Sequence, residues 1–221
     1  MMKKLLTILL LISFAQYLKA QETRNLIPFN SIYVYGNIEL ELIKSDTNKL
    51  EISKVESGTV NSEVKDRNLT ISYTMIGDEY RIKAKLYFKD LHEITAKAAV
   101  NISSKKSLVF DWVNIRLSKG AKAKLEIIAT DFDIVVLQGS KFDLSGKGEN
   151  GKIYCNAGGI CNAKSFKIKD ADVRCATMGK ATIWVYGNLN ASTHTGGKIY
   201  YFIEPKTISV RAITGGEIQK R

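Results

Sequence analysis

The stretch Gly196-Gly197-Lys198-Ile199 consists of two small residues, a polar residue and an apolar residue, and it belongs to a set of six similar units. The six units are Gly120-Ala121-Lys122-Ala123, Gly139-Ser140-Lys141-Phe142, Gly158-Gly159-Ile160-Cys161, Met178-Gly179-Lys180-Ala181, Gly196-Gly197-Lys198-Ile199 and Gly215-Gly216-Glu217-Ile218. Their first positions are 19, 19, 20, 18 and 19 residues apart. A fixed period of about 20 residues is typical of a solenoid, in which similar turns of chain stack on one another.

Apolar and polar residues alternate after each small pair, as from Ala121 to Ile127, and this period of two is typical of half-buried strands. When the units are aligned, one phase holds only apolar or thiol side chains: Ala123, Phe142, Cys161, Ala181, Ile199 and Ile218. A second phase, three positions before each unit, also holds small or apolar residues: Leu117, Val136, Cys155, Cys175, Thr193 and Ala212. Both sets predict columns of side chains stacked inside the solenoid.

The same alternation continues through the N-terminal half, for example in Ile38 to Leu42 and Ile82 to Leu86. No helical stripe of period 3.6 persists in the chain. We therefore expect an all-β protein that folds as a single-stranded right-handed parallel β-helix with coils of about 19–20 residues. The consensus of leucine-rich repeats and the six-residue period of left-handed β-helices are both absent, which argues against these solenoids.

The N-terminus has the pattern of a secretory signal peptide. Lys3 and Lys4 precede an apolar run from Leu5 to Phe14, and Ala20 ends a tolerable cleavage site. The apolar run is too short to cross a bilayer. We expect residues 1–20 to be removed and residues 21–221 to form one exported β-helix domain without a transmembrane segment, located in the periplasm, at the cell surface or outside the cell.

The chain is basic, with a formal net charge of +11 that falls to +8 when Lys3, Lys4 and Lys19 leave with the signal peptide. Such a charge favours anionic partners. The aligned units predict a basic column on one face: Lys122, Lys141, Lys180 and Lys198. This column is either a binding face for an anionic glycan or another cell-surface component, or a solvated face that keeps a β-surface soluble. No nucleic-acid-binding module is recognisable, so we expect no nucleic-acid partner.

A third phase contains short acidic and amide residues, which are suited to a corner of each coil. Its members are Asp111, Asp131, Asn150, Asp170 and Asn190. Stacked carboxylates could instead form an acid pair or a Ca²⁺ site, and parallel β-helices do host polysaccharide lyases and glycoside hydrolases. The two histidines, His92 and His194, lie in no catalytic motif. We therefore expect no catalytic residue, metal site or cofactor, with a polysaccharide lyase or glycoside hydrolase as the alternative.

Three cysteines remain in the exported chain. Cys155 and Cys175 fall in the same interior column on adjacent coils, where a Cα separation of about 4.8 Å would permit a disulfide. The alternative is that both are reduced core residues. Cys161 occupies the other column and is expected to be a buried thiol.

Several stretches resemble the putative auto-transporter adhesin head GIN domain family, a domain of unknown function common in Bacteroidetes-type bacteria. They are Phe29-Asn30-Ser31-Ile32-Tyr33-Val34-Tyr35-Gly36, Leu91-His92-Glu93-Ile94-Thr95-Ala96, Gly196-Gly197-Lys198-Ile199-Tyr200-Tyr201 and Ile213-Thr214-Gly215-Gly216-Glu217-Ile218. The resemblance covers residues 26–218 and implies a parallel β-helix, but it implies no catalytic residues. Many relatives place Gly before the proline of the closing stretch, whereas Glu204 precedes Pro205 here.

These features together predict an exported, non-enzymatic module that binds or scaffolds at the cell envelope. The coils leave few residues for the long insertions from which β-helix enzymes build their sites. We also expect self-association, because a solenoid exposes unpaired strand edges at its ends. Residues 21–91, which lack the glycine units, are expected to cap the N-terminal end.

Overall fold

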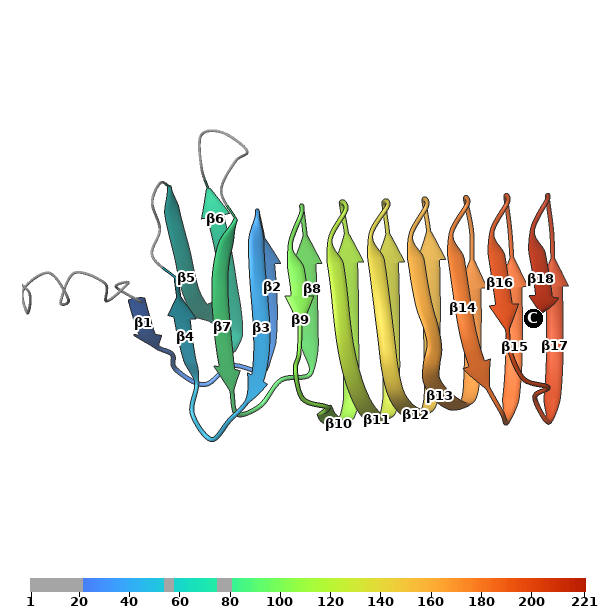
Figure 1. The fold of residues 1–221 in the computed structure, drawn as a ribbon, viewed down its shortest axis with the longest axis horizontal. Coiled ribbons are helices and arrows are strands. Elements are labelled where there is room, and N and C mark those ends of the chain that lie inside the picture. The colour runs from blue at the N-terminus through green and yellow to red at the C-terminus, as the bar shows by residue number, and fades with distance from the viewer. Residues whose placement is uncertain (1–21, 54–57, 75–80) are drawn as a thin grey trace, which may run out of the picture.

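The structure is a computed structural model that describes residues 22–53, 58–74 and 81–221. The predicted signal peptide, residues 1–20, lies outside the described residues. Within the described residues, eighteen strands form one continuous sheet that winds into a parallel solenoid of about seven turns (Figure 1), which confirms the predicted fold class. The part of the chain that the structure describes contains no helix able to cross a membrane.

The strands cover most of the described chain. Their bounds are β1 Glu22–Asn25, β2 Ser31–Tyr35, β3 Ile38–Lys44, β4 Lys49–Ile52, β5 Thr59–Lys65, β6 Asn68–Thr74, β7 Ile82–Phe88, β8 Glu93–Lys97, β9 Asn101–Ser103, β10 Leu108–Ser118, β11 Lys122–Leu137, β12 Lys141–Asn156, β13 Ile160–Cys175, β14 Lys180–Val185, β15 Asn188–Thr193, β16 Lys198–Tyr201, β17 Thr207–Ala212 and β18 Glu217–Lys220.

Each coil has two faces (Figure 1). Tight turns join the faces at one edge in the repeat region, and in β11 to β13 the strand itself bends from one face to the other at the opposite edge. The first face follows the tight turns and comprises β3, β7, β9, β14, β16, β18 and the first halves of β11 to β13. The second face comprises β2, β6, β8, β15, β17 and the second halves of β10 to β13. In β11 the bend falls where two consecutive residues, Thr130 and Asp131, both face outward and so reset the alternation.

The glycine units form the tight turns. Two successive residues have left-handed φ, such as Gln138 at 52° and Gly139 at 69°, and Ser140 N donates to Leu137 O over 3.1 Å. This is the pattern of a type I′ turn. Met178 adopts a φ of 60° at the first position of its unit, so the turn tolerates other residues there.

The second position of the unit is small for a different reason. A Cβ on Gly159 would overlap the carbonyl oxygen of Val136 in the preceding coil, and a Cβ on Gly179 would overlap that of Cys155. At these two positions, close approach of the neighbouring coil therefore leaves no room for a Cβ.

The first coil in the chain is not the first in the stack. β2 pairs with both β6 and β8, and β3 pairs with both β7 and β9. The β2–β3 coil therefore lies between two coils that come later in the sequence (Figure 1). β4 pairs antiparallel with β1 and β7, and β5 pairs antiparallel with β6, so these strands cap the N-terminal end. The predicted capping role of residues 21–91 applies to β1, β4 and β5, whereas β2, β3, β6 and β7 are ordinary coils.

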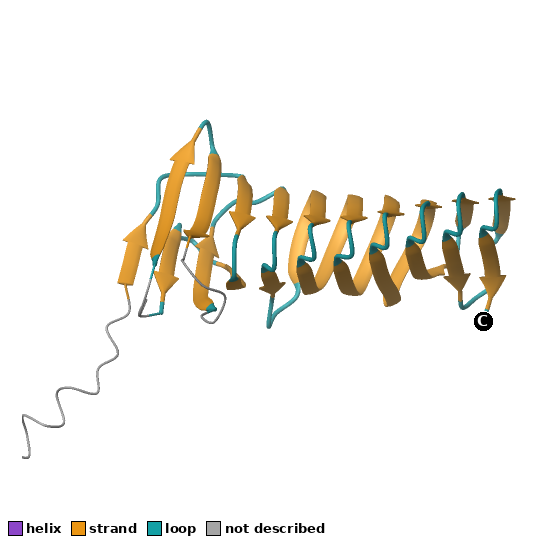
Figure 2. Ribbon diagram, turned by 90° about the horizontal axis from the view of Figure 1, so that it is seen from above, coloured by secondary structure: helices purple, strands orange, loops and turns teal. Residues whose placement is uncertain are grey.

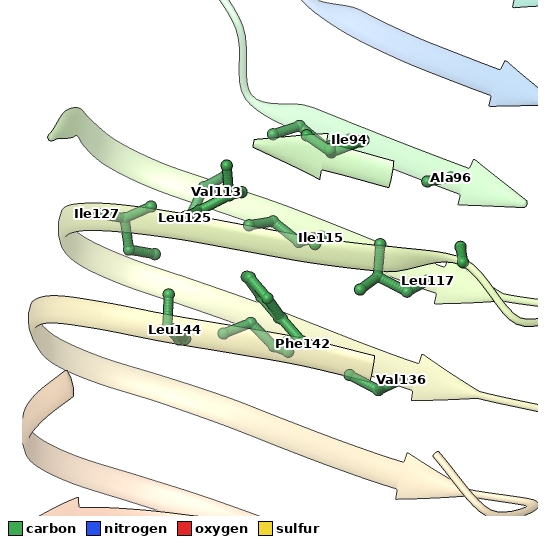
Figure 3. Packing of buried hydrophobic residues seen from close by; sticks show 14 of the residues in the cluster. Ile94, Ala96, Val113, Ile115, Leu117, Leu125, Ile127, Val136, Phe142 and Leu144 are labelled. Atoms are coloured by element: carbon green, nitrogen blue, oxygen red, sulfur yellow. The ribbon is translucent and has the colours of Figure 1, made fainter. Parts of the chain in front are cut away.

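The core lies between the two faces, which run side by side along the molecule (Figure 2). Register pairs join all the members of both predicted interior columns, from Ala123 to Ile218 and from Leu117 to Ala212. Figure 3 shows members of the core that point into this interior from both faces, such as Phe142 and Leu125 from the first face and Ile115 from the second. Burial of these side chains is the main stabilising contribution.

Candidate functional site

The predicted basic column exists as a register column on the first face. Lys122 of β11 pairs with Lys141 of β12, and Lys180 of β14 pairs with Lys198 of β16. Ile160 of β13 lies between these two pairs, as the sequence indicates. The column therefore divides into two halves, each with two lysines.

The first half lines a groove of about 720 Å³, a volume typical of ligand sites. Asn101 and Ser103 of the short strand β9 form its floor, because their side chains are shorter than those of the neighbouring strands. We call it the basic groove and define it by its charged residues: Glu39, Glu41, Glu51, Lys83, Lys85, Lys122, Lys124, Lys141 and Asp143. Strands β7 and β3 supply one wall, and β11 and β12 supply the other.

The carboxylates of the basic groove are bonded to residues outside it. Glu39 pairs with Arg81 at 3.5 Å, and Glu41 pairs with Lys105 at 3.0 Å. Asp143 accepts a hydrogen bond from the Asn162 amide at 3.0 Å. None of these three partners lines the groove.

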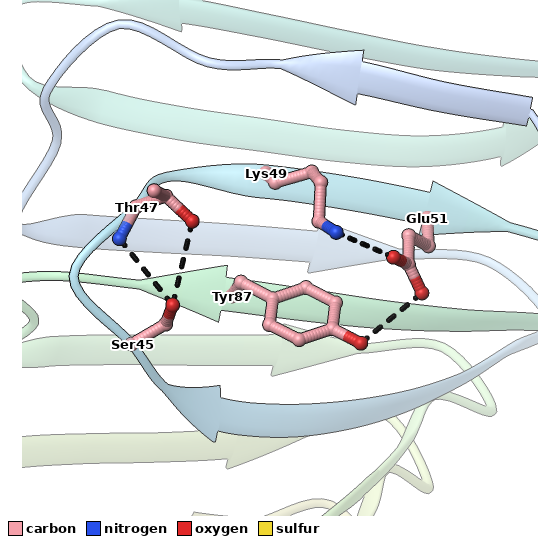
Figure 4. Close-up of polar contacts among 5 residues, drawn as sticks. All are labelled: Ser45, Thr47, Lys49, Glu51 and Tyr87. Atoms are coloured by element: carbon pink, nitrogen blue, oxygen red, sulfur yellow. Dashed lines mark hydrogen bonds and ion pairs between the residues drawn. The ribbon is translucent and has the colours of Figure 1, made fainter.

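Glu51 is held most firmly of the four (Figure 4). It lies 2.6 Å from the Lys49 ammonium group and accepts a hydrogen bond from the Tyr87 hydroxyl at 3.2 Å. Lys49 also lies over the Tyr87 ring, 4.3 Å from its centroid. The hydrogen bond to Glu51 raises the pKa of Lys49, and desolvation followed by the same carboxylate raises the pKa of Tyr87. Both shifts keep the Lys49 ammonium group and the Tyr87 hydroxyl protonated at neutral pH.

The five lysines of the basic groove differ from its carboxylates in their contacts with the rest of the protein. Lys83, Lys85, Lys122, Lys124 and Lys141 are all exposed. Across residues 22–53, 58–74 and 81–221, their ammonium groups make no ion pair or hydrogen bond. The basic groove thus presents positive charge that the protein itself leaves uncompensated.

The second half of the basic column is partly satisfied by the protein. Lys198 forms an ion pair with Glu217 at 3.3 Å. Lys180 lies over the ring of Tyr200, 5.3 Å from its centroid, and Arg221 lies over the same ring at 3.8 Å. These contacts leave Lys180 and Lys198 less available to an external anion than Lys122 and Lys141.

The predicted acidic and amide column lies at the bends. Asp131, Asn150 and Asp170 are register partners, as expected. The two ends of the column were predicted wrongly: Trp112, not Asp111, pairs with Asp131, and Asn190 pairs with Asp172. The coil after β13 is only 18 residues long, so Asn188 takes the place expected for Asn190, and it donates to Asp170 from both its backbone and its side chain.

A groove of about 550 Å³ follows these bends, and we call it the bend groove. Its polar residues and its exposed aromatic residue are Trp112, Asn114, Asp131, Asp133, Asn150, Lys152, Asp170, Asp172, Asn188 and Asn190. It shares no residue with the basic groove. Among the described residues, no group of three or more His, Cys, Asp or Glu side chains is placed to hold a metal ion.

The three cysteines form a buried cluster of free thiols. Cys155 and Cys175 are register partners, as predicted, and Cys155 also contacts Cys161. The hydrogen bond with Cys155 and then burial raise the pKa of Cys161 well above its usual value. The hydrogen bond with Cys161 lowers the pKa of Cys155, but the hydrogen bond with Cys175 and burial outweigh it, so that pKa is also raised. A Cys155–Cys175 disulfide stays a prediction.

Sequence reasoning missed half of the basic groove and the exposed aromatic residue of the bend groove, Trp112. Lys83-Ala84-Lys85 and Lys122-Ala123-Lys124 are the same triplet, and their alanines lie in one interior column through Leu40 and Ile102. The repeated triplet could have revealed the shared face. The position of Trp112 could not be found without the 19-residue register to Asp131.

Several solved structures resemble this one. A "putative adhesin" from Bacteroides fragilis has a TM-score of 0.78 and 16% identity, and 91% of this chain aligns with 96% of that one. A "putative adhesin" from Parabacteroides distasonis has a TM-score of 0.74 and 18% identity, with coverages of 91% and 96%. A "putative lipid binding protein" from the same species has a TM-score of 0.66 and 17% identity, with the same coverages. No curated protein matches the sequence.

At these identities the solved structures show a shared fold. Membership is decided by the family model described as "Putative auto-transporter adhesin, head GIN domain", which matches residues 28–205. Because this match covers most of the sequence, the chain belongs to the putative auto-transporter adhesin, head GIN domain, family.

Proposed function

We propose that the protein is an exported, non-enzymatic, adhesin-like module of the cell surface or envelope that binds an anionic polysaccharide in the basic groove. The adhesin names of the family and of its structural neighbours support a binding role. The observation that carries the proposal is the contrast inside the basic groove. Its carboxylates are bonded to partners outside it, whereas its five lysines have no partner in the described chain.

The geometry favours a long ligand over a compact one. The lysines come from three strands of the first face, β7, β11 and β12, on both sides of the floor formed by β9. Adjacent strands in a sheet lie about 4.8 Å apart, so the ammonium groups are spread along the solenoid axis. A polymer with regularly spaced anionic groups can contact several of them at once, while a single small anion cannot.

The test uses the chain without its signal peptide and measures binding to dextran sulfate, with uncharged dextran as the matched polymer. We expect binding to dextran sulfate that weakens steeply as salt rises, since exposed charge pairs are screened. Vesicles that contain an anionic phospholipid, compared with zwitterionic vesicles, test a lipid head group as the source of the anion. Preference for the vesicles would overturn the polysaccharide assignment.

Two variants of equal charge separate the groove from the column as a whole. Lys122→Gln/Lys141→Gln removes two charges inside the basic groove, and Lys180→Gln/Lys198→Gln removes two from the same column outside it. We expect the first pair to weaken dextran sulfate binding roughly fivefold or more at low salt, and the second pair to have a smaller effect. Equal effects would show that net charge, not the groove, determines binding.

The enzymatic alternative, a polysaccharide lyase or glycoside hydrolase, is tested with the same samples. After long incubation with a polyuronate, we expect no new reducing ends and no unsaturated products. Either product would overturn the non-enzymatic assignment. Because it would also require an acid or a base, it would redirect attention to the carboxylates of the bend groove.

A further inference from the structure

The bend groove lies along the edge of the solenoid where each coil passes from the first face to the second. Two outward-facing rows of side chains border it. One contains Trp112, Asp131 and Asn150, and the other contains Asp133 and Lys152, which are register partners. Between the rows, Phe132 faces inward and Gly151 carries no side chain, so the polar rows stand above a bare backbone floor.

The polar groups in the middle of the groove are not engaged by the protein. Asp172 is held by Arg174 through two hydrogen bonds of 3.1 and 2.9 Å. By contrast, Asp131, Asp133 and Asn150 form no hydrogen bond or ion pair with any residue that the structure describes. These three side chains come from adjacent coils and offer two carboxylates and one amide to a ligand.

Trp112 provides a fixed aromatic surface at one end of the groove. It is 45% exposed, which is unusual for so large an apolar side chain in a strand. Its ring stacks on His92, with a centroid distance of 4.7 Å and an interplanar angle of 16°, and His92 Nε2 lies 3.0 Å from an Asp90 carboxylate oxygen. The indole is therefore held in place before a ligand arrives, which lowers the entropic cost of binding.

We infer that the bend groove is a second binding site, specific for an uncharged oligosaccharide. A sugar ring has an apolar face, which suits stacking on Trp112, and hydroxyl groups at its edge, which can donate to Asp131 and Asp133. Hydrogen bonds to carboxylates are stronger than those to neutral acceptors. The groove contains four carboxylates and a single ammonium group, so it disfavours the anionic polymers that suit the basic groove. This inference does not depend on the proposed function of the basic groove.

The test uses the intrinsic fluorescence of Trp112 in the chain without its signal peptide. The protein has two tryptophans, so a Trp184→Phe background leaves Trp112 as the sole reporter. Cellohexaose, maltohexaose and N-acetylchitohexaose serve as uncharged probes, and polygalacturonate serves as the anionic comparison. We expect at least one uncharged probe to change the Trp112 emission at millimolar or lower concentration, with an affinity that is insensitive to salt.

Variants assign the site, and calorimetry measures the affinity in otherwise unaltered protein. Trp112→Ala is expected to weaken binding roughly tenfold or more, as removal of an aromatic anchor usually does. Asp131→Asn/Asp133→Asn preserves shape and is expected to weaken binding severalfold. Val109→Ala, on the same strand and 66% exposed but outside the groove, is the matched control and should leave the affinity unchanged.

Two results would overturn the inference. One is the absence of binding by all three uncharged probes at millimolar concentration, with the protein shown to be folded by its circular dichroism. The other is binding that Trp112→Ala leaves intact or that Lys122→Gln/Lys141→Gln weakens instead. The two sites are tested independently. Binding of the uncharged probes to the bend groove is expected not to depend on salt, whereas the basic groove is tested with the charged polymer dextran sulfate.

Discussion

The two halves of the molecule contain the same kind of coil but stack their coils in different orders. From β10 to β18 the coils stack in the order of the sequence, whereas among β2 to β9 the first coil is inserted between two later ones. The cross-section is nevertheless continuous, because the column that begins with Ala84, Leu40 and Ile102 runs on through Ala123. The β2–β3 coil keeps the inward column continuous although it is out of sequence order, so the inward pattern alone does not determine stacking order.

The difference is visible at the second position of the tight turn. Lys122 N donates to Val100 O just as Lys141 N donates to Ala121 O, so Val100 holds this position in the N-terminal half. Along the stack this position holds Val100, then Ala121 and Ser140, and glycine in the last four turns, Gly159, Gly179, Gly197 and Gly216. At Gly159, Gly179 and Gly197 a Cβ would overlap the backbone of the preceding coil, which explains the glycines of these turns.

The largest contrast should be seen in thiol chemistry, because all three cysteines lie in the regular half. The reactive species is the thiolate, and the raised pKa values of Cys155 and Cys161 keep these buried thiols protonated. We expect no labelling of the native protein by a thiol reagent at pH 8 and complete labelling after unfolding and reduction. Raising the pH to 9 should accelerate labelling of the unfolded chain and leave the native protein unlabelled.

The same experiment shows whether Cys155 and Cys175 form a disulfide. Without reductant, three thiols per unfolded chain would show that the cysteines are free, as in the structure. A single thiol, recovered as three after reduction, would show the Cys155–Cys175 bridge. Rapid labelling of the native protein would contradict the rigid packing of the regular half.

A substitution at the crowded turn position should have the next largest effect. Gly159→Val places a side chain against the backbone of Val136 in the preceding coil. We expect it to lower the free energy of unfolding by about 3 kcal/mol or more, at the upper end for overpacking. Urea denaturation followed by circular dichroism measures the change.

The adjacent glycine is the matched control for this substitution. Gly158→Ala adds a Cβ that meets no atom within 4 Å but adopts a left-handed φ of 73°. Gly158→Ala should lower the free energy of unfolding by only about 1–2 kcal/mol, the usual penalty for a residue other than glycine in the left-handed conformation. Equal costs at the two positions would refute crowding as the reason for the second glycine.

The sequence predicts the regular half in detail because each tight turn repeats the same physical requirement. Left-handed φ and close approach of coils select small residues at a fixed period, so the register of the columns follows from spacing alone. The N-terminal half lacks this signal: its corresponding turn uses Ala98 and Ala99 at φ of 57° and 62°, with no glycine. The insertion of β2–β3 between later coils depends on long-range pairing, which no local pattern encodes.

The candidate sites, like the fold, could be predicted from the sequence only where the repeat period determines the register. The basic column follows from the period, so Lys122 and Lys141 could be placed on one face. The groove itself depends on the short side chains of β9 and on the wall supplied by β7, both in the half without repeats. Trp112 escaped prediction because the first regular coil aligns with the next at 19 residues, not at the 20 that link Asp111 to Asp131.

The two ends of the solenoid offer a further contrast, which concerns the predicted self-association. Antiparallel strands cover the N-terminal end, whereas all six residues of β17 are exposed, including Val210 at 57%. We expect self-association through β17, and Val210→Lys should weaken it about tenfold, since it adds a charge to an apolar edge. Sedimentation over a range of concentrations measures it, with Ile27→Lys at the opposite end as the control. A mass that does not change with concentration would contradict the prediction.

The smallest effect should come from the one unit whose first residue is not glycine. Met178 is 73% exposed and has a φ of 60°, so Met178→Gly removes a strained left-handed conformation while losing little packing. The gain of about 1 kcal/mol or more is partly offset by the greater entropy of glycine in the unfolded chain. We therefore expect a net increase in the free energy of unfolding of roughly 0.5 kcal/mol, whereas Met178→Ala, which keeps the strain, should be nearly neutral. A loss of stability in Met178→Gly would mean that the regular half tolerates left-handed residues without cost, and the glycines at the first position would then need another explanation.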